Sequence, residues 1–153
     1  MRLSTRSLYG LRAIFDIAYH YDGQPVQVKD ISKRQKISPR YLEQIFQRLK
    51  KTGVLKSKRG PHGGYYLAKM PKEITVGDIL RATEGSLQLV FCTTAKKIKK
   101  CDLLEKCVTR SVWEETGQRI TKFLDSVSIQ DLCKKGELLG IEKELPHGLM
   151  YSI

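Results

Sequence analysis

Long apolar runs are missing from this chain of 153 residues. No segment approaches the roughly 20 apolar residues that a membrane-spanning helix requires. Near the N-terminus, Arg6, Arg12 and Asp16 interrupt the apolar residues, so the segment lacks the core of a signal peptide. We therefore expect a cytoplasmic protein without a membrane partner.

Catalytic side-chain sets are also missing. The three histidines, His20, His62 and His147, are scattered, and no Ser-His-Asp, metalloprotease or paired-carboxylate pattern accompanies them. The glycines at 60, 63 and 64 could cradle a nucleotide phosphate, but no Gly-Lys-Ser/Thr signature or strand-turn-helix context goes with them. We expect that this protein is not an enzyme.

Closely spaced cysteine pairs, which most zinc fingers and ribbons use, are absent. Instead Cys92, Cys101 and Cys107 lie in one lysine-rich stretch, and Cys133 follows 26 positions after Cys107. In a reducing compartment such a cluster favours metal binding or redox chemistry over disulfides. Widely spaced thiolates in a loop suit an iron–sulfur cluster, and nearby lysines lower thiol pKa values. Three free cysteines in a loop remain the alternative.

Acidic residues are scarce between positions 29 and 72, where thirteen Lys and Arg stand against only Asp30 and Glu43. The whole chain has a formal net charge of +12, yet residues 108–153 hold six basic and seven acidic residues. The positive charge is therefore focused on one region, as is typical of a surface that contacts phosphate. A lysine-rich surface that is merely solvated is the alternative.

Apolar spacing predicts helices at residues 8–20, 28–36 and 39–52. Ser38 is suited to be the N-cap of the third, with Pro39 at its first position, and the last two together make a helix-turn-helix pattern. Helical periodicity predicts that the third helix buries one set of side chains: Leu42, Ile45, Phe46 and Leu49. Its outward face offers long donors and an aromatic ring, which suit a DNA groove: Arg40, Tyr41, Glu43, Gln44, Gln47, Arg48 and Lys51.

The next segment predicts a β-hairpin from two short runs, 54–58 and 65–69, around a glycine-rich tip that carries Arg59 and His62. A hairpin directly after a helix-turn-helix is a wing, and a wing-tip arginine suits the minor groove or adjacent phosphates. A short helix at 75–84 follows, with Thr75 and Asp78 in capping-box positions.

After the cysteine segment we expect one long helix that pairs with a second copy of the chain. Its apolar seam follows a heptad pattern: Trp113, Gly117, Ile120, Leu124 and Val127. Packing of this helix on its own domain is the alternative. The predicted fold is mainly α with a small β-hairpin wing: a winged helix-turn-helix domain at 1–85, a cysteine effector loop at 86–107, a dimerisation helix at 108–135 and a C-terminal tail at 136–153.

Three stretches carry a family resemblance: MRLSTRSLYGLRA (1–13), ISPRYLEQIFQRLKKTGVLKSKRGPHGGYYLAK (37–69) and ITVGDILRATEG (74–85). With the three-cysteine loop, they resemble the Rrf-two family of bacterial winged-helix transcription regulators, and most of all its IscR-type members. The resemblance implies a homodimer that binds a double-stranded DNA operator, with repression as its expected action. It also implies an iron–sulfur cluster, [2Fe-2S] or [4Fe-4S], whose gain, loss or modification changes DNA affinity in response to iron–sulfur, redox or nitric oxide status.

Residue by residue, the resemblance implies cluster ligands Cys92, Cys101 and Cys107. The predicted DNA contacts combine matching family positions with Arg2 and the outward-facing Arg48: Arg2, Ser38, Arg40, Tyr41, Glu43, Gln44, Arg48, Ser57, Arg59, Gly60 and His62.

The fourth cluster ligand is open, because Arg110 stands where IscR-type proteins have a histidine and Leu8 where nitric-oxide-sensing relatives have an aspartate. A water or exogenous thiol is one candidate, and the others are protein side chains: Glu84, Asp102, Glu105, Cys133, and Ser7 or Tyr9 of the partner subunit. A regulator of the same fold that acts as a cluster-free thiol redox or metabolite sensor is the alternative function.

Overall fold

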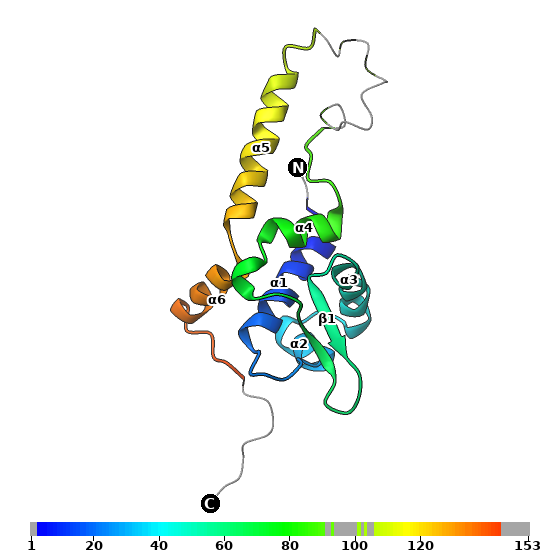
Figure 1. Ribbon diagram of the computed structural model, residues 1–153, viewed down its shortest axis with the longest axis vertical. Coiled ribbons are helices and arrows are strands. Elements are labelled where there is room, and N and C mark those ends of the chain that lie inside the picture. Colours follow the sequence, from blue (N-terminus) through cyan, green and yellow to red (C-terminus); the bar gives the residue numbers. More distant parts are fainter. Residues whose placement is uncertain (1–2, 91–92, 94–100, 102, 104–105, 145–153) are drawn as a thin grey trace, which may run out of the picture.

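The computed structural model describes residues 3–90, 93, 101, 103 and 106–144. Within this part of the chain, six α-helices and a two-stranded antiparallel hairpin form a winged-helix domain with a projecting helix. Figure 1 shows α1 near the centre of the domain, the hairpin at one end and α5 extending from the opposite end. The predicted fold class is confirmed.

The first three helices are α1 (Thr5–Tyr19), α2 (Val28–Gln35) and α3 (Pro39–Lys51). Ser4 caps α1, so this helix begins three residues before its apolar stripe. Lys36 closes α2 in the left-handed conformation, with φ 55°, and the Ser38 Oγ accepts a hydrogen bond from the Tyr41 amide at 3.3 Å. These two caps make the tight turn between α2 and α3.

The hairpin pairs β1 (Leu55–Lys58) with β2 (Gly64–Leu67), so that Leu55 lies opposite Leu67. Val26, in the loop before α2, exchanges two backbone hydrogen bonds with Tyr65, at 2.9 and 2.8 Å. This close approach requires glycine at position 64, where a Cβ would lie 2.4 Å from the Val26 carbonyl oxygen. The wing is thus attached to the body of the domain along β2.

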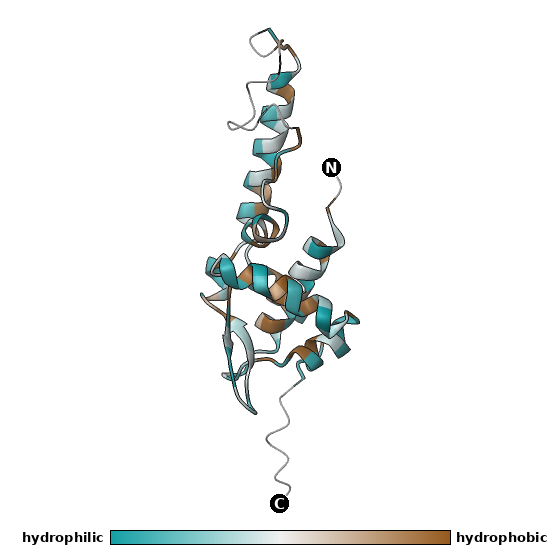
Figure 2. Ribbon diagram, turned by 90° about the vertical axis from the view of Figure 1, so that its right-hand side faces the viewer, coloured by the Kyte–Doolittle hydropathy of each residue, from teal (hydrophilic) through white to brown (hydrophobic). Residues whose placement is uncertain are grey.

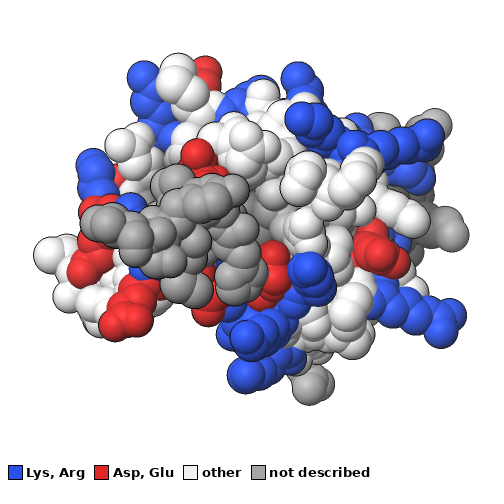
Figure 3. Space-filling model, turned by 90° about the horizontal axis from the view of Figure 1, so that it is seen from below, with Lys and Arg blue, Asp and Glu red and all other residues white. Residues whose placement is uncertain are grey.

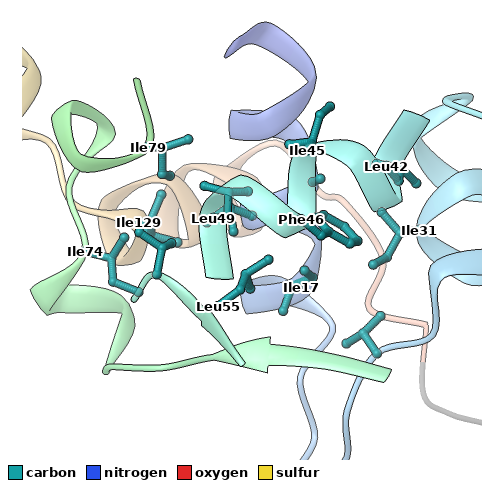
Figure 4. Close-up of a cluster of buried hydrophobic side chains, with 14 of the residues drawn as sticks. Ile17, Ile31, Leu42, Ile45, Phe46, Leu49, Leu55, Ile74, Ile79 and Ile129 are labelled. Carbon is teal, nitrogen blue, oxygen red and sulfur yellow. The ribbon is translucent and has the colours of Figure 1, made fainter. Parts of the chain in front are cut away.

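The short helices η1 (Pro71–Glu73) and α4 (Val76–Glu84) follow, and Thr75 and Asp78 form the predicted capping box. The core lies between α1, α3, α4 and the hairpin, and its side chains come from nearly every element (Figure 4). The fully buried side chains include Ile14, Ile17, Ile31, Leu42, Ile45, Phe46, Leu49, Leu55, Ile74, Ile79 and Ile129.

The segment predicted as one helix, 108–135, is instead two helices, α5 (Arg110–Ser126) and α6 (Ile129–Leu138). Val127 is extended, with φ −100° and ψ 111°. Its carbonyl oxygen accepts from the Val76 amide at 2.9 Å, and the Ile129 amide donates to the Ile74 carbonyl at 2.9 Å. Burial of Ile129 in the core stabilises this break, which lets α6 pack on α1. A Ser128 to Asp131 capping box marks the start of α6.

Residues 141–144, in the described part of the predicted tail, contact the end of α1 and α2. The Tyr19 hydroxyl donates to the Ile141 carbonyl oxygen at 2.7 Å, and Glu144 pairs with Arg34 at 3.0 Å. The Glu144 amide donates to Nδ1 of His20 at 3.1 Å. Burial lowers the pKa of His20, which favours the neutral ring that this bond needs.

No side chain of α5 is buried in the single chain. It carries exposed apolar side chains, Val112 and Trp113 near its outer end and Phe123 near its inner end, and Figure 2 shows apolar and polar patches along its length. A helix that exposes such side chains lacks a packing partner for them among the described residues of this chain. Val127 does not continue the predicted seam, because it lies past the end of the helix.

The inner end of α5 is joined firmly to α4. Arg81 donates to Asp125 on α5 at 2.7 Å and to Asp78 on its own helix at 2.9 Å. Asp125 lies so close to Gly77 that a Cβ there would meet its Oδ1 at 1.9 Å. The direction in which α5 leaves the domain is therefore set by contacts with α4.

Candidate nucleic-acid interface

The helix α3 has one buried face and one polar, exposed face. Leu42, Ile45, Phe46 and Leu49 are all completely buried, as the periodicity predicted. The exposed face carries six of the predicted polar side chains, at the spacing of one helix side: the donors Arg40, Gln44, Gln47, Arg48 and Lys51, and the acceptor Glu43. Tyr41 is half-buried, because its ring meets Tyr9 of α1 edge-on at a centroid distance of 6.0 Å.

The wing places a second set of polar side chains beside α3. Arg59, Gly60 and His62 are exposed at its tip, where Gly60 has φ +112°. Ser57 on β1 accepts a hydrogen bond from Lys50 of α3 at 2.7 Å. This contact ties the recognition helix to the wing, so that both present their polar groups as one unit.

The exposed face of α3 has two flanks. On the wing flank, Phe46 packs on Tyr65 with ring centroids 4.6 Å apart. Glu43 also acts there, because its charge adds to the effect of burial in raising the pKa of Tyr65. On the opposite flank, Tyr41, Gln44, Arg48 and Lys51 line a hollow between α3, α1 and α4. The recognition helix therefore stands between the wing and this hollow.

Charge is distributed unevenly on the end of the molecule that carries the wing. In Figure 3, Lys and Arg side chains stand around the rim, while most acidic side chains gather at the left. Besides Arg59, the exposed bases of this region include Lys56 and Lys58 on β1. Surfaces that pair with phosphates have this kind of positive field.

The predicted DNA-contact residues between 38 and 62 thus lie on α3 and the wing, two neighbouring elements. Arg2 lies outside the described residues. The prediction left out Lys50, Lys56 and Lys58 of the wing flank and Arg6 in the hollow. The first three were detectable from the basic composition of residues 29–72, whereas the place of Arg6 depends on how α1 packs.

Of the three predicted cluster ligands, Cys101 and Cys107 are half-exposed and Cys92 lies outside the described residues. Cys107 lies 3.4 Å from the hydroxyl of Thr109, just before α5. This hydrogen bond, followed by backbone donors at Thr109 and Arg110, lowers the pKa of the Cys107 thiol. The thiolate that metals and iron–sulfur clusters bind is therefore favoured at this position, although the described residues include no assembled metal-binding group.

The structure also bears on the candidates for a fourth ligand. Glu84 already accepts hydrogen bonds from the Ser4 amide at 2.8 Å and the Ser7 hydroxyl at 2.6 Å. Ser7 is completely buried, and Arg110 pairs with Glu114 at 2.7 Å. Asp102 and Glu105 lie outside the described residues, and half-exposed Tyr9 packs against Tyr41.

Cys133 is a poor candidate within one chain. It lies on α6 and packs against the core, where burial raises the pKa of its thiol. The 17 residues of α5 separate it from Cys107, a length of about 25 Å at 1.5 Å per residue.

The three-helix core, the exposed recognition helix and the attached wing define a winged helix-turn-helix transcription regulator. The chain belongs to the Rrf2 family: the family model, described as an iron-dependent transcriptional regulator, matches residues 3–135. None of the helices in the described part of the chain combines the length and apolar composition of a membrane span. The prediction that the protein is not an enzyme agrees with relatives that are named as transcription regulators.

Curated relatives include the HTH-type transcriptional regulator IscR of Pectobacterium atrosepticum, 38% identical over 92% of this chain and 84% of that protein. IscR of Escherichia coli O1:K1 is 37% identical over 92% of this chain and 85% of that protein. Among solved structures, IscR of T. potens is 40% identical with a TM-score of 0.73, covering 94% of both chains. CymR, the global cysteine regulator of B. subtilis, is 31% identical with a TM-score of 0.74, covering 88% of this chain and 98% of that one.

Proposed function

We propose that this transcription regulator binds an operator through α3 and the wing as a homodimer, and that an iron–sulfur cluster held by Cys92, Cys101 and Cys107 controls its DNA affinity. The observation that carries the DNA-binding part is the joint polar surface of α3 and the wing, tied by the Lys50 to Ser57 hydrogen bond of 2.7 Å. Its donors are exposed and its bases greatly outnumber its acids, as phosphate and base-edge contacts require.

Replacing Arg59 by alanine is expected to weaken binding to a selected operator by about 1–3 kcal/mol, because the wing-tip guanidinium is exposed and free to enter a groove. An operator is first obtained by selecting duplexes from a random pool, and affinity is then measured by fluorescence anisotropy. Arg119→Ala is the matched control: it removes the same charge from α5, where the Arg119 side chain is 79% exposed. Equal affinities of Arg59→Ala and the control would remove the wing from the mechanism.

The cluster proposal rests on the donor chemistry of the cysteine segment. Cys107 has a lowered thiol pKa and Cys101 is accessible, so both are suited to bind iron as thiolates. The cluster would supply a redox-sensitive and labile group at the outer end of α5. The similarity to relatives named IscR supports the same cluster proposal.

Protein isolated without oxygen is expected to be coloured and to contain iron and sulfide, and Cys101→Ala is expected to lose both to background. Cys133→Ala is the control, because Cys133 packs against the core on α6 and should leave iron content unchanged. Visible absorbance and iron and sulfide analysis measure the effect. A colourless wild type that still binds its operator would exclude the cluster.

The homodimer proposal rests on α5, which buries none of its side chains in a single chain. A second copy of the helix would cover the apolar side chains that its outer part exposes, and a two-fold axis would place two winged domains side by side. Trp113, Gly117, Ile120 and Leu124 remain the proposed interface, and the Trp113 side chain is 43% exposed in the single chain.

Gly117→Leu is expected to raise the dimer dissociation constant at least about tenfold, or ~1.4 kcal/mol. A Cβ at Gly117 meets no atom of the described residues within 4 Å, so the larger side chain is expected to press on the partner helix. Glu115→Leu is the control, since residue 115 lies on the opposite side of α5. Sedimentation equilibrium gives the constants, and a Gly117→Leu dimer as tight as wild type would point to another interface.

A cluster-free thiol sensor is the second candidate function. It is favoured by the lowered pKa of the Cys107 thiol and by the likeness to CymR of Staphylococcus aureus, whose crystal structure is known in an oxidized form. In that case colourless protein would lose or gain operator affinity on mild oxidation, and Cys107→Ser would abolish the response.

A further inference from the structure

The hollow beside α3 lies on the flank that faces away from the wing. It measures about 570 Å³ and lies between α1, α3 and α4, and its polar lining comes from Arg6, Tyr41, Gln44, Gln47, Arg48 and Lys51. Tyr41, Gln44, Arg48 and Lys51 follow one another at intervals of three and four residues, so they share one side of the helix. Arg6, the second residue of α1, lines the hollow from the other side.

The lining is basic and rich in donors. Arg6, Arg48 and Lys51 bring three positive charges, Gln44 and Gln47 bring amide groups, and none of the described residues that line the hollow is acidic. Glu43, the acid on α3, acts on the other flank, where its charge affects Tyr65. The hollow therefore attracts an anion and offers groups that bond it.

Arg6 is the member whose bonding is incomplete. Its Nε is buried and has no hydrogen-bond partner among the described residues. The acid that senses its charge is Glu84, but the pKa of Glu84 is lowered first by hydrogen bonds from Ser4 and Ser7 and least by Arg6. A buried guanidinium N–H without an acceptor is costly, so an anion in the hollow would satisfy it.

We propose that the hollow binds a phosphate of the DNA backbone, and that Arg6 holds this phosphate together with Arg48 and Lys51. The proposal rests on the proposed function, because a recognition helix in a major groove has a sugar-phosphate strand on each side. The wing meets one of these strands, and the hollow takes the other. Arg6 is then a positioning contact that sets the register of α3 in the groove without reading base sequence.

The test compares wild type, Arg6→Ala, Arg6→Lys and the control Arg119→Ala on a selected operator and on an unrelated duplex, over a range of salt concentrations. Arg6→Ala is expected to lose roughly tenfold in affinity on both duplexes and to lower the slope of log K against log salt by about 0.9. Arg6→Lys should recover the slope, because it restores the charge. Arg119→Ala should match wild type.

Ethylation interference then identifies the phosphate. One phosphate whose ethylation weakens wild-type binding should no longer matter to Arg6→Ala, and circular dichroism melting shows whether the variants are folded. If Arg6→Ala is unfolded, Arg6→Gln takes its place in both measurements, since it removes the charge and keeps most of the side chain. An unchanged salt slope and interference pattern in folded Arg6→Ala would overturn the proposal while leaving the wing-based function standing. Failure of the wild type to bind DNA would overturn both.

Discussion

Replacing Asp16 by alanine is expected to lower the free energy of unfolding by about 3–5 kcal/mol, because it removes the buried partner of a largely buried arginine and leaves Arg34 only the ion pair with Glu144, whose side chain is 57% exposed. The Asp16 side chain is 0% exposed and that of Arg34 only 12%. Arg34 donates to both carboxylate oxygens, through Nη2 at 2.7 Å and Nε at 3.0 Å. Gln35 adds a bond at 2.9 Å, so one carboxylate joins α1 to the end of α2.

Urea unfolding measures this effect, and Glu115→Ala is the control. Glu115 pairs with Arg119 at 2.6 Å on α5, but its side chain is 64% exposed, and exposed pairs of this kind contribute only about 0.3–0.5 kcal/mol. Asp16→Asn should fall between the two, since the amide keeps the shape and part of the bonding. A loss below about 1 kcal/mol for Asp16→Ala would contradict the role given to this pair.

Replacing Phe46 by alanine is expected to cost about 3–5 kcal/mol, because it opens a cavity in the core. Phe46 is completely buried on α3, and its ring packs on Tyr65 of the wing at a centroid distance of 4.6 Å. The loss would be a large part of the roughly 5–15 kcal/mol that holds a typical domain folded. DNA affinity should fall as well, since α3 and the wing would lose their shared packing.

Tyr21→Ala is the control for this second substitution, because it also removes an aromatic ring, but one that is 51% exposed in the loop after α1. Its unfolding free energy should change by no more than about 0.5 kcal/mol. Operator affinity is measured at a temperature where both variants are folded. If Phe46→Ala were as stable as the wild type, the predicted cost would be wrong, because the surrounding side chains would have filled the cavity.

Much of the DNA-binding domain was predictable because its signals are local. The Ser38 cap, Pro39 and the four-residue apolar set of α3 lie within twelve positions of one another, and the structure confirms each of them. The hairpin was placed by its glycines, although its strands are shorter than predicted and begin at Leu55 and Gly64. Short-range periodicity and capping are decided by neighbouring residues, so they can be read along the chain.

The break between α5 and α6 was missed although part of its signal was visible. Ser128 and Asp131 form the same kind of capping box that correctly placed the start of α4 at Thr75. The prediction followed the heptad spacing through Val127 and did not consider this capping box. What ends α5 is the pairing of residues 127–129 with residues 74–76, about fifty positions earlier in the chain. Local periodicity contains no information about that pairing.

By itself, the sequence determined the class of this protein: a basic winged helix-turn-helix regulator with a cysteine segment before its long helix. Helix caps, apolar periodicity and charge composition are short-range properties, so they can be recognised in the sequence without knowledge of the fold. Only the tertiary structure decided that α5 buries none of its side chains, that Cys133 packs against the core, and that Arg6 joins Arg48 and Lys51 in one hollow. These features depend on contacts between residues that are distant in the chain, and packing alone brings those residues together.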